Sequence, residues 1–121
     1  MIDTLINKII EKKNPTVAGL DPKLDYVPED MKQAAFSEYG ENFTGAAQAI
    51  LQFNKTLIDA LCDIVPAVKP QCAYYEMYGI EGMRCLYETI RYAQKNGMYV
   101  ILDAKRGDIG ATSEAYARAY L

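Results

Sequence analysis

Residues 99–104 read YVILDA, an uninterrupted apolar run that ends on an aspartate and an alanine. Val100 and Ile101 are β-branched, and a continuous apolar run of this length is typical of a strand covered on both faces of a parallel sheet. The next four residues, 105–108, read KRGD, so charged side chains directly follow the predicted strand. This stretch therefore predicts both the type of sheet and the edge of the sheet where chemistry is expected.

Two shorter runs upstream are interpreted as strands of the same sheet. Residues 16–20 read TVAGL and are closed by Asp21-Pro22, and residues 67–70 read AVKP. The proline that ends the second run has no amide proton to donate to a neighbouring strand, so that strand is expected to stop there. The sequence thus predicts three short strands.

The segments around these strands have the apolar spacing of helices. Helices are predicted over residues 2–13, about 29–36, a long segment capped by Thr44, residues 80–96, and a last segment capped by Thr112 or Ser113. The apolar stripe of the long helix is predicted to consist of Ile50, Phe53, Leu57, Leu61 and Ile64. That of the helix over 80–96 is predicted to consist of Met83, Leu86, Tyr87, Ile90 and Ala93. Strands separated by helices define an α/β fold of parallel βαβ units with right-handed crossovers.

The charge balance excludes some kinds of partner. The 121 residues contain 13 Lys and Arg against 16 Asp and Glu, a net charge of −3, which gives no basic footprint for nucleic acid or an anionic membrane. No apolar run approaches the roughly 18 residues of a membrane span. The first residues, MIDT, lack the order of a signal peptide. A soluble, cytoplasmic chain is expected.

The residue types that are missing exclude some kinds of chemistry. The chain has no histidine, so a Ser-His or Cys-His relay and a zinc site built on imidazole are impossible within it. Cys62, Cys72 and Cys85 form no CxxC pair, and three reduced, mostly buried thiols are expected. Any catalysis must therefore use Asp, Glu, Lys or Tyr.

Charged residues end all three predicted strands. The first ends at Asp21, the second at Lys69, and the third at Asp103 and Lys105, with Asp108 three residues further on. In parallel α/β folds ligands bind at the carboxyl ends of the strands, so these side chains are predicted to converge on one site. From the spacing alone, a network of ion pairs with a purely structural role is a second interpretation.

Other polar and aromatic groups are given structural interpretations. The aromatic residues between Tyr74 and Tyr78 are expected to pack over the end of the second strand, and Glu76 to be a solvated or ion-paired carboxylate rather than a general acid. Arg106 is interpreted as a surface loop residue. Residues 110–113, GATS, are interpreted as a capped helix start rather than an anion site.

Three motifs carry a resemblance to a known family. They are GLDP at 19–22, AVKPQ at 67–71 and DAKRGDIG at 103–110, one on each successive strand. In this order they closely resemble orotidine 5′-phosphate decarboxylase, in the longer bacterial branch of that family. The resemblance covers most of the chain and implies a TIM (β/α)8 barrel. Residues 1–121 would hold roughly its first three β/α units, as the N-terminal part of a single domain, and the C-terminal part of the barrel is expected beyond Leu121.

The resemblance implies a reaction and its catalytic groups. The substrate would be a nucleotide, orotidine 5′-phosphate, which is decarboxylated to uridine 5′-phosphate without a metal or cofactor. Lys105 is implied to donate the proton to C6 of the pyrimidine after CO₂ leaves. Asp103 is implied to lie against the departing carboxylate, and Lys69 to hold Asp103 and contact the ribose.

The resemblance also implies a homodimer with shared active sites. Asp108 resembles the residue that this family lends to the partner's site, with Ile109 and Thr112 beside it. Asp21 resembles a ligand of a ribose hydroxyl. The phosphate-binding residues and the lid are expected beyond Leu121.

Two alternatives differ in chemistry. A related sugar-phosphate decarboxylase would use Mg²⁺, but such relatives carry an acidic residue near the end of the second strand, where this chain has Lys69. The other alternative is a non-catalytic fragment or assembly half, in which the charged cluster is structural.

Overall fold

The structure is a computed structural model that describes residues 1–106 and 109–120. Three strands form one parallel sheet in the order β1-β2-β3: β1 (Val17–Leu20), β2 (Ala67–Pro70) and β3 (Tyr99–Val100). Ala67 of β2 pairs with Val17 on one side and with Tyr99 on the other. Because the strands are parallel and adjacent, their carboxyl ends lie at the same edge of the sheet. The predicted α/β class and all three predicted strands are confirmed.

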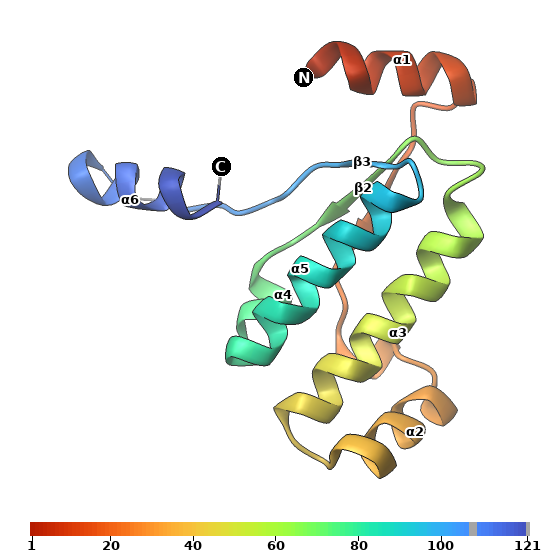
Figure 1. Cartoon of the computed structure of the whole chain (residues 1–121), viewed down its shortest axis with the longest axis vertical. Coiled ribbons are helices and arrows are strands. Elements are labelled where there is room, and N and C mark those ends of the chain that lie inside the picture. Colours follow the sequence, from red (N-terminus) through yellow and green to blue (C-terminus); the bar gives the residue numbers. More distant parts are fainter. Residues whose placement is uncertain (107–108, 121) are drawn as a thin grey trace.

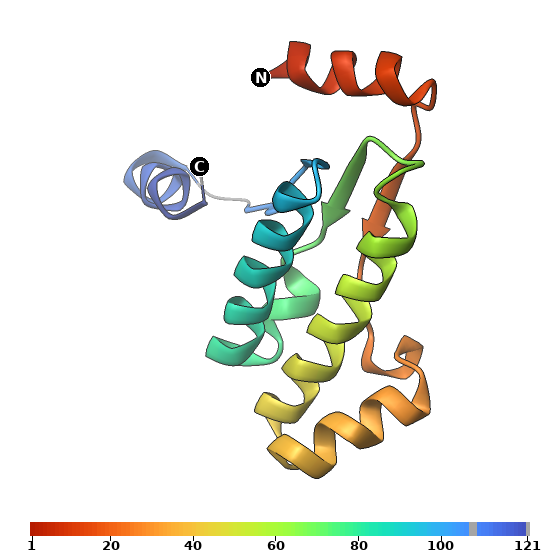
Figure 2. The same cartoon turned by 45° about the vertical axis from the view of Figure 1, so that its right-hand side comes forward.

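The third strand is shorter than the apolar run predicts. Its ladder contains only Tyr99 and Val100, yet alternate amides of the run continue to donate to β2: Ile101 to the carbonyl of Val68 at 2.9 Å and Asp103 to that of Pro70 at 3.0 Å. The run stays extended as far as Asp103, which forms a parallel bridge with Gln71. Residues 99–102 are only half-buried, so the prediction of cover on both faces is wrong for this chain, because the two long helices lie over one face of the sheet only (Figures 1 and 2).

The helices surround one face and one end of the sheet (Figures 1 and 2). They are α1 (Ile2–Lys12), α2 (Glu29–Tyr39), α3 (Phe43–Leu61), α4 (Ala73–Glu76), α5 (Gly79–Lys95) and α6 (Gly110–Tyr120), with a 3₁₀ turn η1 (Leu24–Tyr26) before α2. In both views α3 and α5 run side by side over one face of the sheet, and α1 crosses the end where the strands begin. In both views α6 extends away from the body. None of the described helices is long and apolar enough to cross a membrane.

The core lies between the sheet and the two helices α3 and α5. One buried cluster joins the strands to the helix ends and contains Leu20, Ile58, Val65, Val68, Ala93 and Met98. A second cluster lies nearer the carboxyl ends of the strands and is centred on Ala46, Ala49, Ile50, Cys72, Tyr75 and Leu86. All three cysteines are free thiols, two of them buried, as the sequence predicts. Removing these apolar side chains from water is the main force that holds the helices on the sheet.

Several predicted helix boundaries and faces are wrong in detail. Asn42 rather than Thr44 caps α3, and its Oδ1 accepts hydrogen bonds from the amides of Thr44 at 2.8 Å and Gly45 at 3.1 Å. The last helix begins at Gly110, before the predicted caps Thr112 and Ser113. The helix predicted around 29–36 extends from Glu29 to Tyr39.

The predicted apolar stripes of the two long helices are only partly correct. The buried face of α3 contains Ile50, Asn54 and Ile58, whereas the predicted Ile64 lies beyond the helix and is 57% exposed. In α5, Thr89 is buried while the predicted Tyr87 is 60% exposed. In both helices a polar residue lies on the buried face. A prediction from hydrophobicity alone leaves such a residue out, so the predicted face and the observed buried face differ.

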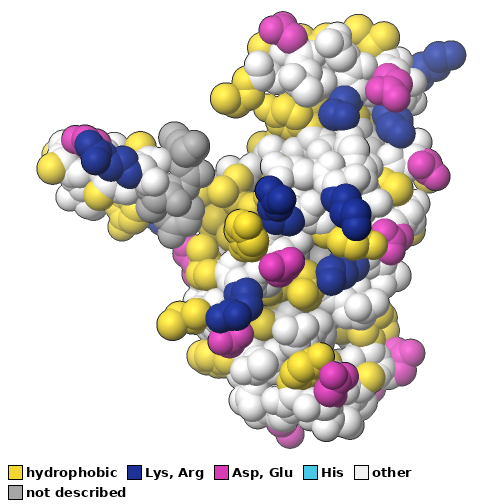
Figure 3. All heavy atoms as spheres, viewed as in Figure 1, with side chains coloured by type: hydrophobic (Ala, Val, Ile, Leu, Met, Phe, Trp, Pro, Cys, Tyr) yellow, Lys and Arg dark blue, Asp and Glu magenta, His cyan; other side chains and the backbone are white. Residues whose placement is uncertain are grey.

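The helical face of the molecule has mixed charge. Figure 3 shows Lys and Arg side chains interspersed with Asp and Glu side chains on this face, with hydrophobic side chains between them. A surface that binds nucleic acid through its phosphates is instead dominated by basic groups. The visible face therefore does not have the charge pattern of a nucleic-acid interface.

Candidate functional site

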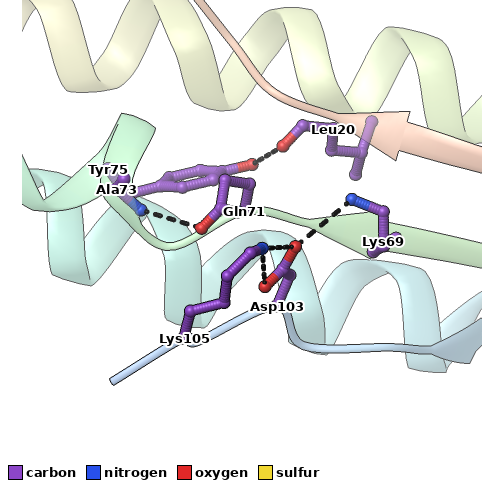
Figure 4. Close-up of polar contacts among 7 residues, drawn as sticks. All are labelled: Leu20, Lys69, Gln71, Ala73, Tyr75, Asp103 and Lys105. Atoms are coloured by element: carbon purple, nitrogen blue, oxygen red, sulfur yellow. Dashed lines mark hydrogen bonds and ion pairs between the residues drawn. The ribbon is translucent and has the colours of Figure 1, made fainter. Parts of the chain in front are cut away.

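Three of the predicted site residues meet at the carboxyl edge of the sheet (Figure 4). Lys69 comes from β2, and Asp103 and Lys105 follow β3. The Nζ of Lys105 lies 2.6 Å from Oδ1 and 2.5 Å from Oδ2 of Asp103, and the Nζ of Lys69 lies 3.6 Å from Oδ2. Asp103 is thus a carboxylate between two ammonium groups, and we refer to these three residues as the charged cluster.

The main chain holds Asp103 on both sides. Its amide donates to the carbonyl of Pro70, and its own carbonyl accepts from the amide of Cys72, each at 3.0 Å. Asp103 and Lys105 are two residues apart in extended chain, which places their side chains on the same face. Lys69 reaches them from the neighbouring strand because consecutive parallel strands end at one edge. The sequence predicted this convergence for the same reason.

The two lysines lower the pKa of Asp103. The hydrogen bond from Lys105 is the largest cause, followed by partial burial, which opposes it, and then by the charges of Lys105 and Lys69. The Asp103 side chain is 18% exposed, whereas that of Lys105 is 74% exposed. The carboxylate is therefore kept ionised inside the cluster, while the ammonium group of Lys105 is accessible to a ligand.

Among the described residues, the predicted site residues Asp21, Ile109 and Thr112 are not part of the charged cluster. Asp21 directly follows β1 and is exposed, and it forms no ion pair with any residue that the structure describes. Ile109 is 86% exposed. Thr112 is exposed within α6, which lies apart from the sheet in Figures 1 and 2. Asp108 lies outside the described residues.

An ion pair that the sequence did not predict borders the cluster. Arg106 forms a salt bridge with Glu76 of α4, and its guanidinium carbon lies 5.6 Å from the centre of the Tyr116 ring. Arg106 lies in a loop, as predicted, but its side chain is only 21% exposed, so it is not a freely solvated surface residue. The ion-paired interpretation of Glu76 is confirmed. Thirty residues separate the two charges, and no local pattern in the sequence could have paired them.

The aromatic segment after β2 packs as predicted. Tyr75 is fully buried and Tyr78 nearly so. The Tyr78 ring meets the ring of Phe43 edge to face, with 6.0 Å between the ring centres. This packing holds Tyr78, the residue before α5, against Phe43, the first residue of α3.

The donor set of the cluster suits an anion better than a metal. Among the described residues, no three carboxylate or thiol side chains come together as a group that could hold a metal ion. Lys69 and Lys105 both direct ammonium groups at Asp103, so a divalent cation there would meet two like charges. Two ammonium groups beside one carboxylate instead leave a net positive site.

A hollow of about 540 Å³ lies elsewhere, between α2 and the start of α3. Its walls include Lys32, Phe36, Asn42 and Tyr78, and none of the charged cluster. A second hollow of about 260 Å³ is lined by Asp21 and Asn54, beside the outer edge of β1. The charged cluster lines neither of these two hollows.

Comparison with known proteins identifies the family. Residues 44–121 match the profile of the orotidine 5′-phosphate decarboxylase / HUMPS family. Orotidine 5′-phosphate decarboxylases of Clostridium tetani and Clostridium acetobutylicum are 42% and 40% identical to this chain over 120 residues, which is 99% of the chain and 38% and 39% of those relatives. The chain therefore spans about two fifths of the length of these curated relatives.

A solved structure gives the same result for the fold. The structure of Leishmania donovani OMP decarboxylase matches with a TM-score of 0.70 and 32% sequence identity, over 98% of this chain and 38% of that one. The open sheet of three parallel strands thus matches part of the TIM barrel of such a decarboxylase. The motifs at the three strand ends, the family profile and the solved structure lead to one conclusion: this chain belongs to the orotidine 5′-phosphate decarboxylase / HUMPS family.

Proposed function

We propose that the protein that carries this chain decarboxylates orotidine 5′-phosphate to uridine 5′-phosphate, with residues 1–121 as the N-terminal part of a single barrel domain. The observation that carries this proposal is the charged cluster, in which Asp103 holds the accessible ammonium group of Lys105 at 2.6 Å. Family membership supports the choice of substrate. The positively charged edge supports a site for an anionic one.

The chemistry follows from the residue types. When the bond from C6 to the carboxyl group breaks, its electron pair stays on C6 as a carbanion in the ring plane, where the π system cannot delocalise it. A fixed ammonium group stabilises that charge as it develops. Lys105 then donates a proton from Nζ to C6, and the resulting amine recovers a proton from water. Every atom and charge is accounted for by the substrate, the lysine and water.

Asp103 and Lys69 position the proton donor. The carboxylate of Asp103 orients Lys105. Lys69, on the neighbouring strand, compensates the negative charge of Asp103. A substrate carboxylate beside Asp103 would bring two like charges together, which raises the energy of the bound substrate but places no positive charge opposite the carbanion. We therefore assign the main catalytic effect to Lys105.

The remaining assignments follow the family resemblance. Asp21 is proposed as a ligand of a ribose hydroxyl, and Asp108, Ile109 and Thr112 as contributors to the site of a second subunit in a homodimer. The C-terminal part of the barrel is proposed to supply the phosphate-binding residues. The exposed position of Asp21, Ile109 and Thr112 is compatible with roles that need further chain or a partner.

Replacement of Lys105 tests the proposal. Lys105→Ala, made in the protein expressed from its complete reading frame, is expected to lower kcat for orotidine 5′-phosphate by several orders of magnitude, because the proton donor and the charge opposite the carbanion are both lost. The fall in absorbance on decarboxylation gives the rate. Lys95→Ala removes an exposed lysine from α5 and is the matched control.

Two results would contradict this assignment. Turnover by Lys105→Ala at a rate close to that of Lys95→Ala would show that Lys105 is not the proton donor. Loss of wild-type activity on addition of EDTA, restored by Mg²⁺, would favour the metal-dependent sugar-phosphate chemistry instead.

A further inference from the structure

Three fully buried polar side chains form a network behind the charged cluster. Asn54 of α3, Tyr75 of α4 and Thr89 of α5 are each 0% exposed. The amide nitrogen Nδ2 of Asn54 donates to the hydroxyl oxygen of Tyr75 at 3.0 Å and to that of Thr89 at 3.1 Å. These two hydrogen bonds join α3, α4 and α5, so the network constrains all three helices at once.

The hydroxyl proton of Tyr75 is directed towards β1. Because Tyr75 accepts from Asn54, its own proton is available, and it donates to the carbonyl of Leu20 at 3.4 Å (Figure 4). The same carbonyl accepts from the amide of Gln71 at 3.3 Å. Leu20 is the last residue of β1, and Gln71 follows the last residue of β2. Tyr75 thus adds a second hydrogen bond to the point where the ends of the two strands are joined.

This junction lies directly before and beside the proposed site residues. Asp21 follows Leu20 in the chain, and Gln71 forms the parallel bridge with Asp103. A shift of the Leu20 carbonyl would therefore move Asp21 relative to the charged cluster. We infer that Tyr75 is a positioning residue, which fixes Asp21 relative to Lys69 and Asp103 through the carbonyl of Leu20; this inference rests on the proposed function.

The surroundings keep Tyr75 in the required place and protonation state. Gly82 of α5 approaches its backbone so closely that a Cβ at residue 82 would lie 1.8 Å from the carbonyl oxygen of Tyr75. Burial raises the pKa of Tyr75 far above its usual range, so its hydroxyl remains a neutral donor. The Oδ1 atom of Asn54 has no hydrogen-bond partner among the described residues, so the orientation of this amide is set by the two hydroxyls it donates to.

Two nearly isosteric variants separate positioning from packing. Tyr75→Phe and Thr89→Val each remove one hydroxyl that accepts from Asn54 and preserve the volume of the side chain. Only Tyr75→Phe also releases the carbonyl of Leu20. Both variants are expected to lower the thermal unfolding midpoint, Tyr75→Phe by more than Thr89→Val, because it loses the bond to Leu20 as well as the one from Asn54. A difference in ligand affinity between the two variants reports on the bond to Leu20.

The expected result is a separation of KM from kcat. In the protein expressed from its complete reading frame, Tyr75→Phe should raise the KM for orotidine 5′-phosphate and the Kd of uridine 5′-phosphate about two- to tenfold, the range of one net hydrogen bond, with kcat nearly unchanged. In Thr89→Val the KM, the Kd of uridine 5′-phosphate and kcat should all stay close to the wild-type values. Equal changes in KM for the two variants would overturn the inference and leave Tyr75 a purely structural residue.

Hydrogen exchange tests the same bond without any substrate. The amide of Gln71 donates to the carbonyl that Tyr75 holds, so its exchange should be faster in Tyr75→Phe than in Thr89→Val. Equal exchange of this amide in the two variants would overturn the inference. A wild-type protein that neither binds uridine 5′-phosphate nor decarboxylates the substrate would instead refute the proposed function, while the exchange result would still decide whether Tyr75 holds the end of β1.

Discussion

Asp103 has a more constrained environment than either lysine that contacts it. Its amide donates to Pro70, the last residue of β2, its carbonyl accepts from the amide of Cys72, and both oxygens of its carboxylate accept from Lys105. Lys105 is largely exposed, so it can exchange this partner for a ligand atom without leaving a buried charge unpaired. The pair therefore combines a constrained carboxylate with an oriented proton donor that a ligand can reach, which is the division of roles that the proposed reaction requires.

The lowered pKa of Asp103 predicts acid sensitivity. A carboxylate whose pKa is lower in the folded state stabilises the fold above its ordinary pKa of about 3.9, and this stabilisation is lost as the pH falls through the lowered value. The wild-type free energy of unfolding should therefore decrease below about pH 4, and Asp103→Asn should decrease less steeply over the same range. Urea unfolding between pH 7 and pH 3 measures this difference.

A matched variant shows whether the lysines around Asp103 cause this acid sensitivity. Asp63→Asn removes an exposed carboxylate that the structure places in no ion pair with another described residue, and its acid profile should follow that of wild type. If Asp103→Asn and wild type lost stability in parallel on acidification, the lysines would not hold the carboxylate in the ionised form.

At the scale of single residues, the sequence predicted the charged cluster but not its neighbours. Lys69, Asp103 and Lys105 could be brought together because the ends of adjacent parallel strands meet at one edge. The salt bridge between Arg106 and Glu76 could not be predicted, because it depends on where α4 lies after β2. The hydrogen bond from Tyr75 to Leu20 likewise depends on tertiary packing.

At the scale of elements, periodicity predicted where the long helices lie and only part of the face that each of them buries. A stripe of hydrophobic residues is assigned from side-chain type, and Asn54 and Thr89 are polar. Both can be buried because the amide nitrogen Nδ2 of Asn54 donates a hydrogen bond to the hydroxyl of Thr89 and another to the hydroxyl of Tyr75. The strand over 99–104 shows the opposite error, because its apolar run predicts cover on both faces and residues 99–102 are only half-buried.

The start of α3 offers a direct test of capping. Asn42→Ala is expected to lower the free energy of unfolding by about 1 kcal/mol, the typical cost of losing an N-cap. Its side chain accepts from two amides of α3 and also donates to the carbonyl of Tyr39 at 3.2 Å. Thr44→Ala, at the cap predicted from sequence, should cost less. Urea unfolding compares the two variants, and a larger loss for Thr44→Ala would contradict the observed cap.

At the scale of the whole molecule, the sheet is open on both sides in the described part of the chain. β1 and β3 are its outer strands, and in Figures 1 and 2 the helices α3 and α5 lie on one face only. An outer strand presents amide and carbonyl groups that can pair with another chain. The match to about two fifths of the relatives' length agrees with a sheet that further strands would continue.

Residues 1–121 expressed alone should therefore form dimers or larger assemblies. Residues 1–121 expressed alone are expected to elute from size exclusion as dimers or larger species and to bind a hydrophobic dye, because the outer strands and the uncovered face are exposed to solvent. The product of the complete reading frame is the comparison. A monomeric segment that binds no dye would show that the open sheet is stable by itself.

The decarboxylation assay on wild-type protein tests the central claim most directly. The protein from the complete reading frame is incubated with orotidine 5′-phosphate labelled at the carboxyl carbon, in the presence of EDTA, and the released CO₂ and the uridine 5′-phosphate are both measured. The account predicts equal amounts of the two products at a rate that EDTA does not change. A pure, folded protein that releases no CO₂ would contradict it and leave Lys69, Asp103 and Lys105 as a structural network of ion pairs.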